Sequence, residues 1–230
     1  PDRAPHMMCR ILAVLAFLAF GLQPAAAGLL LNSYRFGTAA PARSYTYGGS
    51  SAFGTGSSAT YTAAPLGTAD ATRVIVVTVS VRGGGTTSFS GVTIGGNAAT
   101  QAVETSSTND DAAIYYLAVA AGTSADIVVS FSSSQSNGMI SVYSVYNLDA
   151  STPNATASGT AGTATISAST DDIVIATATK RAASSATWTG VTEDGSSNPG
   201  SYFSTASLKR ASGISSVSSA LDQISASVWR

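Results

Sequence analysis

The sequence predicts an all-β protein, a jelly-roll-like antiparallel β-sandwich with an internal duplication of about 99 residues. The first observation is the run 73–81, which is almost entirely β-branched and is soon followed by glycines 83–85. Such residues suit a pleated, packed surface, and the run is too short for a buried helix, so we expect a central strand buried on both faces. The second observation is that short candidate strands follow at the spacing of a sandwich, each closed by Gly, Ser, Asn or Asp.

The duplication rests on a repeat of this central strand. The run returns, altered, at 173–180, and the same register then aligns 89–96 with 188–195, where both copies read aromatic-x-Gly-Val-Thr-x-x-Gly. Two further pairs fall in this register, Thr78 with Thr177 and Arg82 with Arg181. We therefore expect a duplicated strand–loop–strand unit, with chance similarity in a Ser/Thr/Ala/Gly-rich chain as the alternative. In each copy the glycine after the aromatic and the glycine that ends the motif indicate positive φ, as in a bulge or a tight turn.

Residues 1–27 have the pattern of a secretory signal peptide. From Met7 or Met8, Arg10 supplies a positive charge, residues 11–22 form an apolar stretch, and three alanines precede Gly28. The apolar stretch is too short to span a bilayer comfortably, so we expect no membrane segment in the mature form. The alternative is upstream translation, with the protein starting near Leu29.

Residues 28–58 are interpreted as an N-terminal arm and a Gly/Ser-rich linker. The stretch 48–58 is turn-forming, and the short alternating segments 44–47 and 59–62 on either side of it are expected to pair as a hairpin.

Residues 59–230 are expected to form the sandwich, with half-units at about 59–149 and 163–230. Candidate strands of the first half are 73–81, 91–94, 99–104, 112–119, 126–131 and 139–146. A low-complexity bridge, 149–162, precedes the candidate strands 163–169, 173–180, 186–192, 201–209, 214–220 and 224–229. The last of these resembles 140–145. Whether the halves form one sandwich or two lobes is open; we expect one, in which each half completes the sheets of the other.

Composition excludes several classes of function. With 11 Lys+Arg against 12 Asp+Glu there is no basic field, so we expect no nucleic-acid or membrane partner. The only histidine, His6, and the only cysteine, Cys9, lie in the leader. The mature chain therefore has no Ser-His-Asp or Cys-His arrangement, no histidine-containing zinc site and no disulfide. We expect no cofactor.

Carboxylates are the remaining candidates for chemistry. Glu104 and Glu193 are the only glutamates and, with Asp194, could in principle form a glycosidase pair. The alternative of solvated loop charges is favoured, so we expect no catalytic residue and no enzyme. The pairs 110–111 and 171–172 could offer calcium oxygens, but no Asp-x-Asp-x-Asp-Gly spacing is present, so turn capping is favoured and no metal site is expected.

Aromatic residues are the most suggestive candidates for binding. Tyr45, Tyr47 and Tyr61 lie in the polar N-terminal region, outside the core strands, and are interpreted as exposed ligand-binding residues. Trp188 and Trp229 are expected to lie in the core, because Trp188 occupies the place of Phe89 in the repeat.

The segments 73–77, 91–100, 112–117 and 122–131, with the opening 30–36, resemble small β-sandwich proteins of tailed phages and prophages of α-proteobacteria. Those proteins are placed among tail or other virion-associated components. The resemblance covers most of residues 29–230 but lies in turn glycines and core residues, and it transfers no site residues. It implies homo-oligomers or other virion proteins as partners, and a cell-surface glycan as a possible contact. The signal-peptide-like residues 1–27 do not fit this resemblance to phage proteins.

Two functions follow as expectations. The first is a non-enzymatic virion-associated protein of the tail or receptor-contact type. The second is an exported bacterial β-sandwich that binds carbohydrate or another surface. The expected location is accordingly the virion or the extracellular space.

Overall fold

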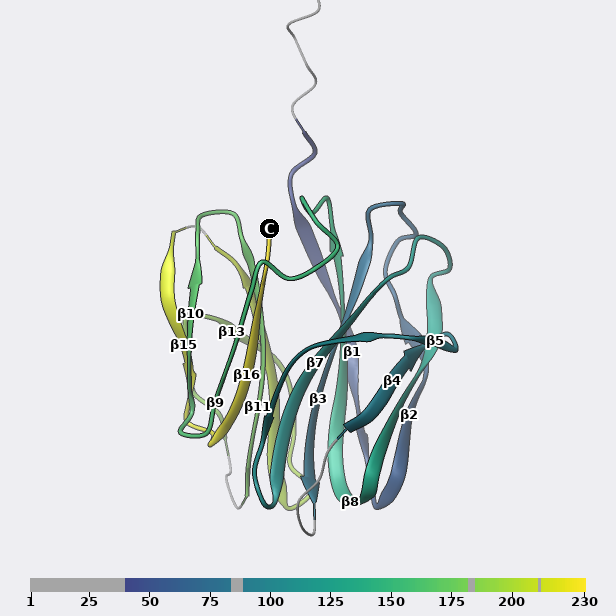
Figure 1. The fold of residues 1–230 in the computed structure, drawn as a ribbon, viewed down its shortest axis with the longest axis vertical. Helices are drawn as coiled ribbons and strands as arrows, with labels where there is room; N and C mark the ends of the chain where they lie inside the picture. The colour runs from purple at the N-terminus through teal and green to yellow at the C-terminus, as the bar shows by residue number, and fades with distance from the viewer. Residues whose placement is uncertain (1–39, 84–88, 182–184, 211) are drawn as a thin grey trace, which may run out of the picture. The chain divides into compact units, whose positions relative to one another are not determined.

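The computed structural model describes residues 40–83, 89–181, 185–210 and 212–230, in which Ala42–Arg230 form one compact unit (Figure 1). Every regular element in the described residues is a strand, which confirms the all-β prediction. The first eight are β1 (Ser44–Phe53), β2 (Gly56–Pro65), β3 (Val74–Gly83), β4 (Phe89–Ile94), β5 (Asn97–Ala98), β6 (Thr100–Ser106), β7 (Asp110–Ala118) and β8 (Ser124–Tyr146). They are followed by β9 (Ala155–Gly159), β10 (Thr163–Ala168), β11 (Ile173–Arg181), β12 (Trp188–Thr189), β13 (Thr192–Ser197), β14 (Ser201–Lys209), β15 (Ile214–Ser219) and β16 (Gln223–Trp229). No helix among the described residues is long and apolar enough to cross a membrane.

Strands β1 to β8, which we call the first half-unit, form two facing sheets. The inner sheet has the order β6-β7-β3-β8-β1, and the outer sheet has the order β5-β4-β8-β2. β8 belongs to both sheets, because its first part lies between β2 and β4 and its last part lies between β1 and β3. Both parts contribute to one core, Val129 from the outer sheet and Val142 from the inner sheet.

Strands β9 to β16, the second half-unit, repeat this plan. The inner sheet has the order β13-β14-β11-β16-β9, and the outer sheet has the order β12-β15-β10. Strand by strand this matches β6-β7-β3-β8-β1 and β4-β8-β2. The register matches too, because Val74 of β3 pairs with Val145 and Ile173 of β11 pairs with Trp229. The duplication is therefore confirmed, and successive strands mostly enter opposite sheets as in a jelly roll, except for β4–β5, β6–β7 and β13–β14, which pair within one sheet. The ungapped alignment of 89–96 with 188–195 does not hold to its end, because Ile94 lies on β4 whereas Glu193 lies on β13, the counterpart of β6.

The two inner sheets pack against each other, which explains why their central strands are buried on both faces. Alternate residues of β3, from Ile75 to Val81, fill the core of the first half-unit, while Val74 and Val76 lie in an apolar cluster between the half-units. β11 is arranged in the same way, with Ile173 and Ile175 in the shared cluster and Val174, Ala176 and Ala178 in its own core.

The rest of this interface is polar. Thr78 Oγ1 lies 3.1 Å from Thr205 Oγ1, and Ser80 Oγ lies 2.5 Å from Thr177 Oγ1. Ser225 Oγ also donates to the carbonyl oxygen of Ala112 at 2.8 Å. Buried hydroxyls that find partners stabilise a fixed docking, so the half-units form one unit although each has its own core.

Three predictions about the linker, the hairpin and the bridge are wrong. The described part of the predicted arm and linker is not a linker, because β1 and β2 are full strands of the sandwich. They do not pair as a hairpin either; the chain passes between sheets at residues 54–55, and both strands pair with β8. The predicted bridge at 149–162 contains β9, so residues 147–154 connect the half-units. The predicted leader, 1–27, lies outside the described residues, as do residues 28–39.

The expectation that each half-unit completes the sheets of the other is also wrong. β1 pairs only within the first half-unit, and β9 pairs only within the second. The glycine prediction is confirmed at three positions and wrong at the fourth: Gly91 has φ 155°, Gly96 has φ 80° and Gly190 has φ 88°, whereas Gly195 is not among the glycines with positive φ. At Gly190 a Cβ atom would lie 3.0 Å from the carbonyl oxygen of Ser216, so a close approach of the backbone adds to the conformational demand.

Candidate functional site

The structure separates the three tyrosines that were interpreted as ligand-binding residues. Tyr45 and Tyr47 on β1 turn toward the cluster between the half-units, whereas Tyr61 on β2 packs against the core of the first half-unit. All three are half-buried. The ring centroids of Tyr47 and Tyr143 lie 5.2 Å apart. Burial raises the pKa of Tyr47. The three rings do not form one exposed platform, and a binding role for them stays a prediction.

Glu193 and Asp194, adjacent in sequence, point to opposite faces of β13. Asp194 lies between the half-units, where its Oδ2 accepts hydrogen bonds from Ser207 Oγ at 2.6 Å and from Tyr143 Oη at 2.9 Å. Burial raises the pKa of Asp194 although both hydrogen bonds lower it. Glu193 lies on the other face, and Glu104 belongs to the first half-unit. The carboxylates considered as a glycosidase pair are therefore not brought together.

The paired aspartates act as turn caps, as predicted. Asp111 Oδ1 accepts the backbone N–H of Ser107 at 2.8 Å, and Asp172 Oδ2 accepts that of Ser169 at 2.8 Å. No group of three or more His, Cys, Asp or Glu side chains within the described residues is placed to hold a metal ion.

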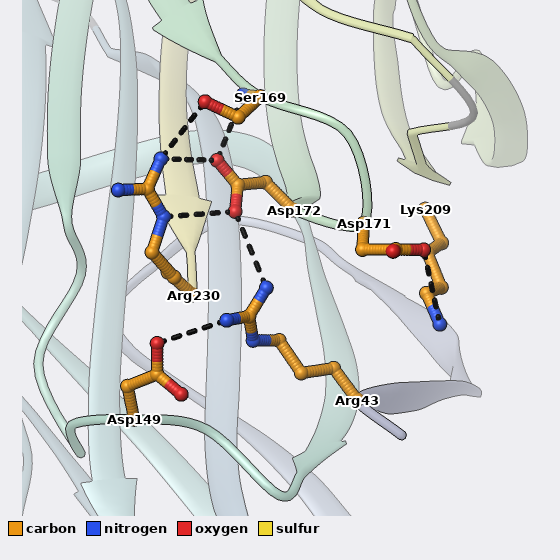
Figure 2. A network of polar contacts seen from close by, with 7 residues as sticks. All are labelled: Arg43, Asp149, Ser169, Asp171, Asp172, Lys209 and Arg230. Atoms are coloured by element: carbon orange, nitrogen blue, oxygen red, sulfur yellow. Dashed lines mark hydrogen bonds and ion pairs between the residues drawn. The ribbon is translucent and has the colours of Figure 1, made fainter.

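Asp172 is also the centre of a charged network, shown in Figure 2, that joins Arg43, Asp149, Asp172 and Arg230. Arg230 binds Asp172 with two donors, Nε to Oδ1 at 3.1 Å and Nη2 to Oδ2 at 3.0 Å. Arg43 Nη1 lies 3.6 Å from Asp172 Oδ1, and its Nη2 donates to Asp149 at 2.8 Å. We call this set the arginine–aspartate network. It connects the start of β1, the residues between the half-units and the residue after β16.

The side chain of Asp172 is only 1% exposed. Burial acts to raise its pKa, but the hydrogen bonds from Arg230 and from the Ser169 backbone, with the charge of Arg43, lower the pKa below its ordinary value of 3.8. The carboxylate is thus held ionised between two arginines.

We expect Asp172→Asn to lower the free energy of unfolding at pH 7 by about 1–3 kcal/mol, because a charge-assisted bidentate pair is lost. A lowered folded pKa gives stability that is present above the unfolded pKa and is lost as the pH falls through the folded pKa. The difference from the wild type should therefore shrink below about pH 4. Chemical denaturation across pH 3–8 measures it.

Asp171→Asn is the matched control. This neighbouring side chain is 67% exposed and its Oδ1 lies 3.7 Å from Lys209 Nζ, so its loss should cost less than about 0.5 kcal/mol. Equal losses in the two variants would contradict the role given to Asp172.

Shallow cavities lie near the network. One of about 390 Å³ is lined by Asp149, Pro153 and Arg230 among others, and one of about 280 Å³ is lined by polar residues that include Asp70 and Tyr146. Neither contains an unpaired catalytic side chain: the charged groups that line the first are engaged in the network and those of the second in turn contacts.

A different cluster, which sequence reasoning missed, lies at the edge of the second half-unit. Trp188 Nε1 donates to Ser204 Oγ at 2.9 Å, and Ser204 Oγ donates to Glu193 Oε2 at 2.9 Å. Tyr202 Oη lies 3.5 Å from Glu193 Oε1. We call these four residues the Trp188 edge. Trp188 is half-buried and Glu193 is exposed, whereas Ser204 and Tyr202 are buried. Trp229, in contrast, is fully buried, as predicted.

The only sequence signal for this cluster was the replacement of Phe89 by Trp188 in the repeat. That replacement predicted a core residue and did not reveal the partners, because Ser204 is brought to the tryptophan by β14. Comparison with protein-family models, with curated proteins and with solved structures finds no match to this chain.

Proposed function

We propose that the protein is a non-enzymatic structural and binding protein, a virion-associated component of the tail or receptor-contact type of a phage or prophage. The observation that carries the proposal is the joining of two jelly-roll half-units through a buried hydrogen-bonded interface, which makes one compact unit. Jelly rolls serve as capsid and lectin domains, where a stiff scaffold presents surfaces to partners. The phage resemblance agrees with this role.

The chemistry of the described residues supports the same class. Arginines balance the charge of Asp172, and two hydroxyls donate hydrogen bonds to the half-buried Asp194, so these carboxylates serve the packing of the half-units. A surface with sparse charge suits assembly with copies of the chain or with other virion proteins, and contact with a neutral cell-surface glycan.

The test is mass analysis of the N-terminus of the native protein, recovered separately from producing cells, from the medium and from released particles. We expect the chain in particles, beginning near Leu29 with an initiator methionine, and an oligomer by light scattering after release. A chain beginning at Gly28, found in the medium and absent from particles, would overturn the virion proposal.

The second candidate is an exported bacterial module that binds carbohydrate or another surface. The Trp188 edge favours it, since an accessible indole beside a fixed carboxylate is a common way to hold a polar ligand. The leader pattern of residues 7–27 agrees with export. The N-terminal analysis above separates the two candidates.

A further inference from the structure

The Trp188 edge lies where the two sheets of the second half-unit end. Trp188 is on β12, the edge strand of the outer sheet, and Glu193 is on β13, the edge strand of the inner sheet. In the described sheets no strand lies beyond β12 or β13, so Trp188 and Glu193 both lie on edge strands, and residues 190–191 join the two strands directly. Edge positions are where a sandwich can offer side chains from both sheets to one ligand.

The carboxylate of Glu193 is exposed yet held in place. Ser204, which is 0% exposed, accepts the indole N–H of Trp188 and donates its own proton to Glu193 Oε2. The serine therefore links the indole and the carboxylate in a fixed arrangement. An ionised carboxylate has about four acceptor positions, and those that Ser204 and Tyr202 leave open are available to donors from solvent.

The equivalent place in the first half-unit is closed. Phe89 stands at the position of Trp188, is only 8% exposed, and has its ring centroid 6.2 Å from that of Tyr115. Gln101 Oε1 accepts a hydrogen bond from Tyr115 Oη at 3.0 Å. Two aromatic rings and an amide thus seal this edge.

Strand register identifies which residues changed between the copies. Val77 pairs with Tyr115, which pairs with Gln101. The residue 99 positions after Val77, Ala176, pairs with Ala206, which pairs with Glu193. The second copy therefore has a methyl group in place of the tyrosine ring and a carboxylate in place of the glutamine amide. The indole of Trp188 replaces the ring of Phe89, and the carboxylate of Glu193 adds a charge, while the buried ring of Tyr202 on β14 lies beside the carboxylate with its Oη 3.5 Å from Glu193 Oε1.

We infer that the Trp188 edge is a binding subsite for a neutral saccharide. The indole can stack on the C–H face of a pyranose ring, and the open acceptor positions of Glu193 can accept a hydrogen bond from a sugar hydroxyl. No cationic side chain takes part in the hydrogen bonds of the cluster, and the nearby Arg210 is engaged with the carbonyl oxygen of Gly190 at 2.7 Å, so the charge within the cluster itself is that of the carboxylate. This inference rests on the proposed binding role and names its ligand class.

Tryptophan fluorescence tests the site directly. The chain has two tryptophans, and Trp229 is 0% exposed, so a ligand-dependent change reports on Trp188. The probes are maltohexaose, cellohexaose, chitohexaose and mannohexaose, each titrated to 10 mM. We expect saturable change and protection from acrylamide quenching with at least one of them. Calorimetry should show a loss of affinity of at least tenfold in Trp188→Ala and in Glu193→Gln.

Gln101→Ala is the matched control, because it removes the equivalent polar side chain in the first half-unit and should leave affinity unchanged. Trp188→Phe guards against misfolding: it retains an aromatic ring, should keep the unfolding temperature, and should weaken binding. The inference is overturned if no hexasaccharide binds the folded protein, if Glu193→Gln binds as the wild type does, or if only tetramethylammonium binds. Recovery in particles without saccharide binding would leave the virion proposal standing.

Discussion

Replacing Arg73 by methionine is expected to lower the free energy of unfolding by about 3–5 kcal/mol, because a buried polar network loses its centre. Arg73 precedes β3 and is 1% exposed. Its guanidinium donates to backbone carbonyls of two loops at 2.8–3.2 Å: Leu66, Gly67, Thr68, Val119, Ala121 and Gly122. Methionine fills similar space but donates no hydrogen bond, so these carbonyls would lose their shared donor.

Urea unfolding at pH 7 measures the loss. Arg82→Met is the matched control at the other end of β3, because Arg82 is only half-buried and its hydrogen bond within the described part of the chain is longer, 3.3 Å to the carbonyl oxygen of Gly200. We expect the control to cost less than about 1 kcal/mol. If Arg73→Met were as stable as Arg82→Met, the expectation would be contradicted, because the two loops would then hold their shape without the guanidinium.

Replacing Asp111 by asparagine is expected to stabilise the protein at neutral and higher pH. Asp111 is 0% exposed, its Oδ2 has no hydrogen-bond partner among the described residues, and its pKa is raised from 3.8 to about 7. Burial is the main cause; Glu104 and Asp110 raise the pKa further, and the backbone N–H of Ser107 opposes them. Asparagine keeps the acceptor for Ser107 and removes the buried charge.

The sign of the pH dependence follows from linkage. The unfolded carboxyl ionises near its ordinary pKa, whereas the folded one retains its proton until about pH 7, so this group makes the folded state progressively less stable as the pH rises between these values. Asp111→Asn should therefore gain about 2–4 kcal/mol over the wild type at pH 8 and almost nothing at pH 4. Thermal and urea unfolding at both pH values measure the gain. A variant that is destabilised at pH 8 would contradict a buried, unpaired carboxylate.

Asp111 and Asp172 show why burial alone does not predict a pKa. Both cap a turn through a backbone N–H, yet the pKa of Asp111 is raised and that of Asp172 is lowered. Two arginines approach Asp172, whereas carboxylates are the charged neighbours of Asp111. The sequence shows two Asp-Asp pairs before apolar strands, but the opposite behaviour depends on groups far away in the chain.

The fold could be predicted to a large extent because its signals are local. β-Branched runs, turn residues and the 99-residue repeat identified β3 and β11 and their equivalence. The similarity between 140–145 and 224–229 predicted the equivalence of β8 and β16, and strand pairing confirms it. The polar stretch 48–58 gave a wrong prediction, because β1 and β2 are edge strands whose many exposed positions need no apolar residue.

The sequence by itself determined that this protein is built from strands, that it contains two copies of one unit, and that their central strands are buried on both faces, since these features follow from side-chain branching and periodicity. Only the tertiary structure decided which sheets meet, which carboxylates are paired, and that the place of Phe89 and Tyr115 in one copy is taken in the other by the half-buried Trp188 beside the exposed Glu193. The reason is that partners such as Ser204 and Arg230 reach their sites through strand pairing and sheet packing, which join residues that no local pattern connects.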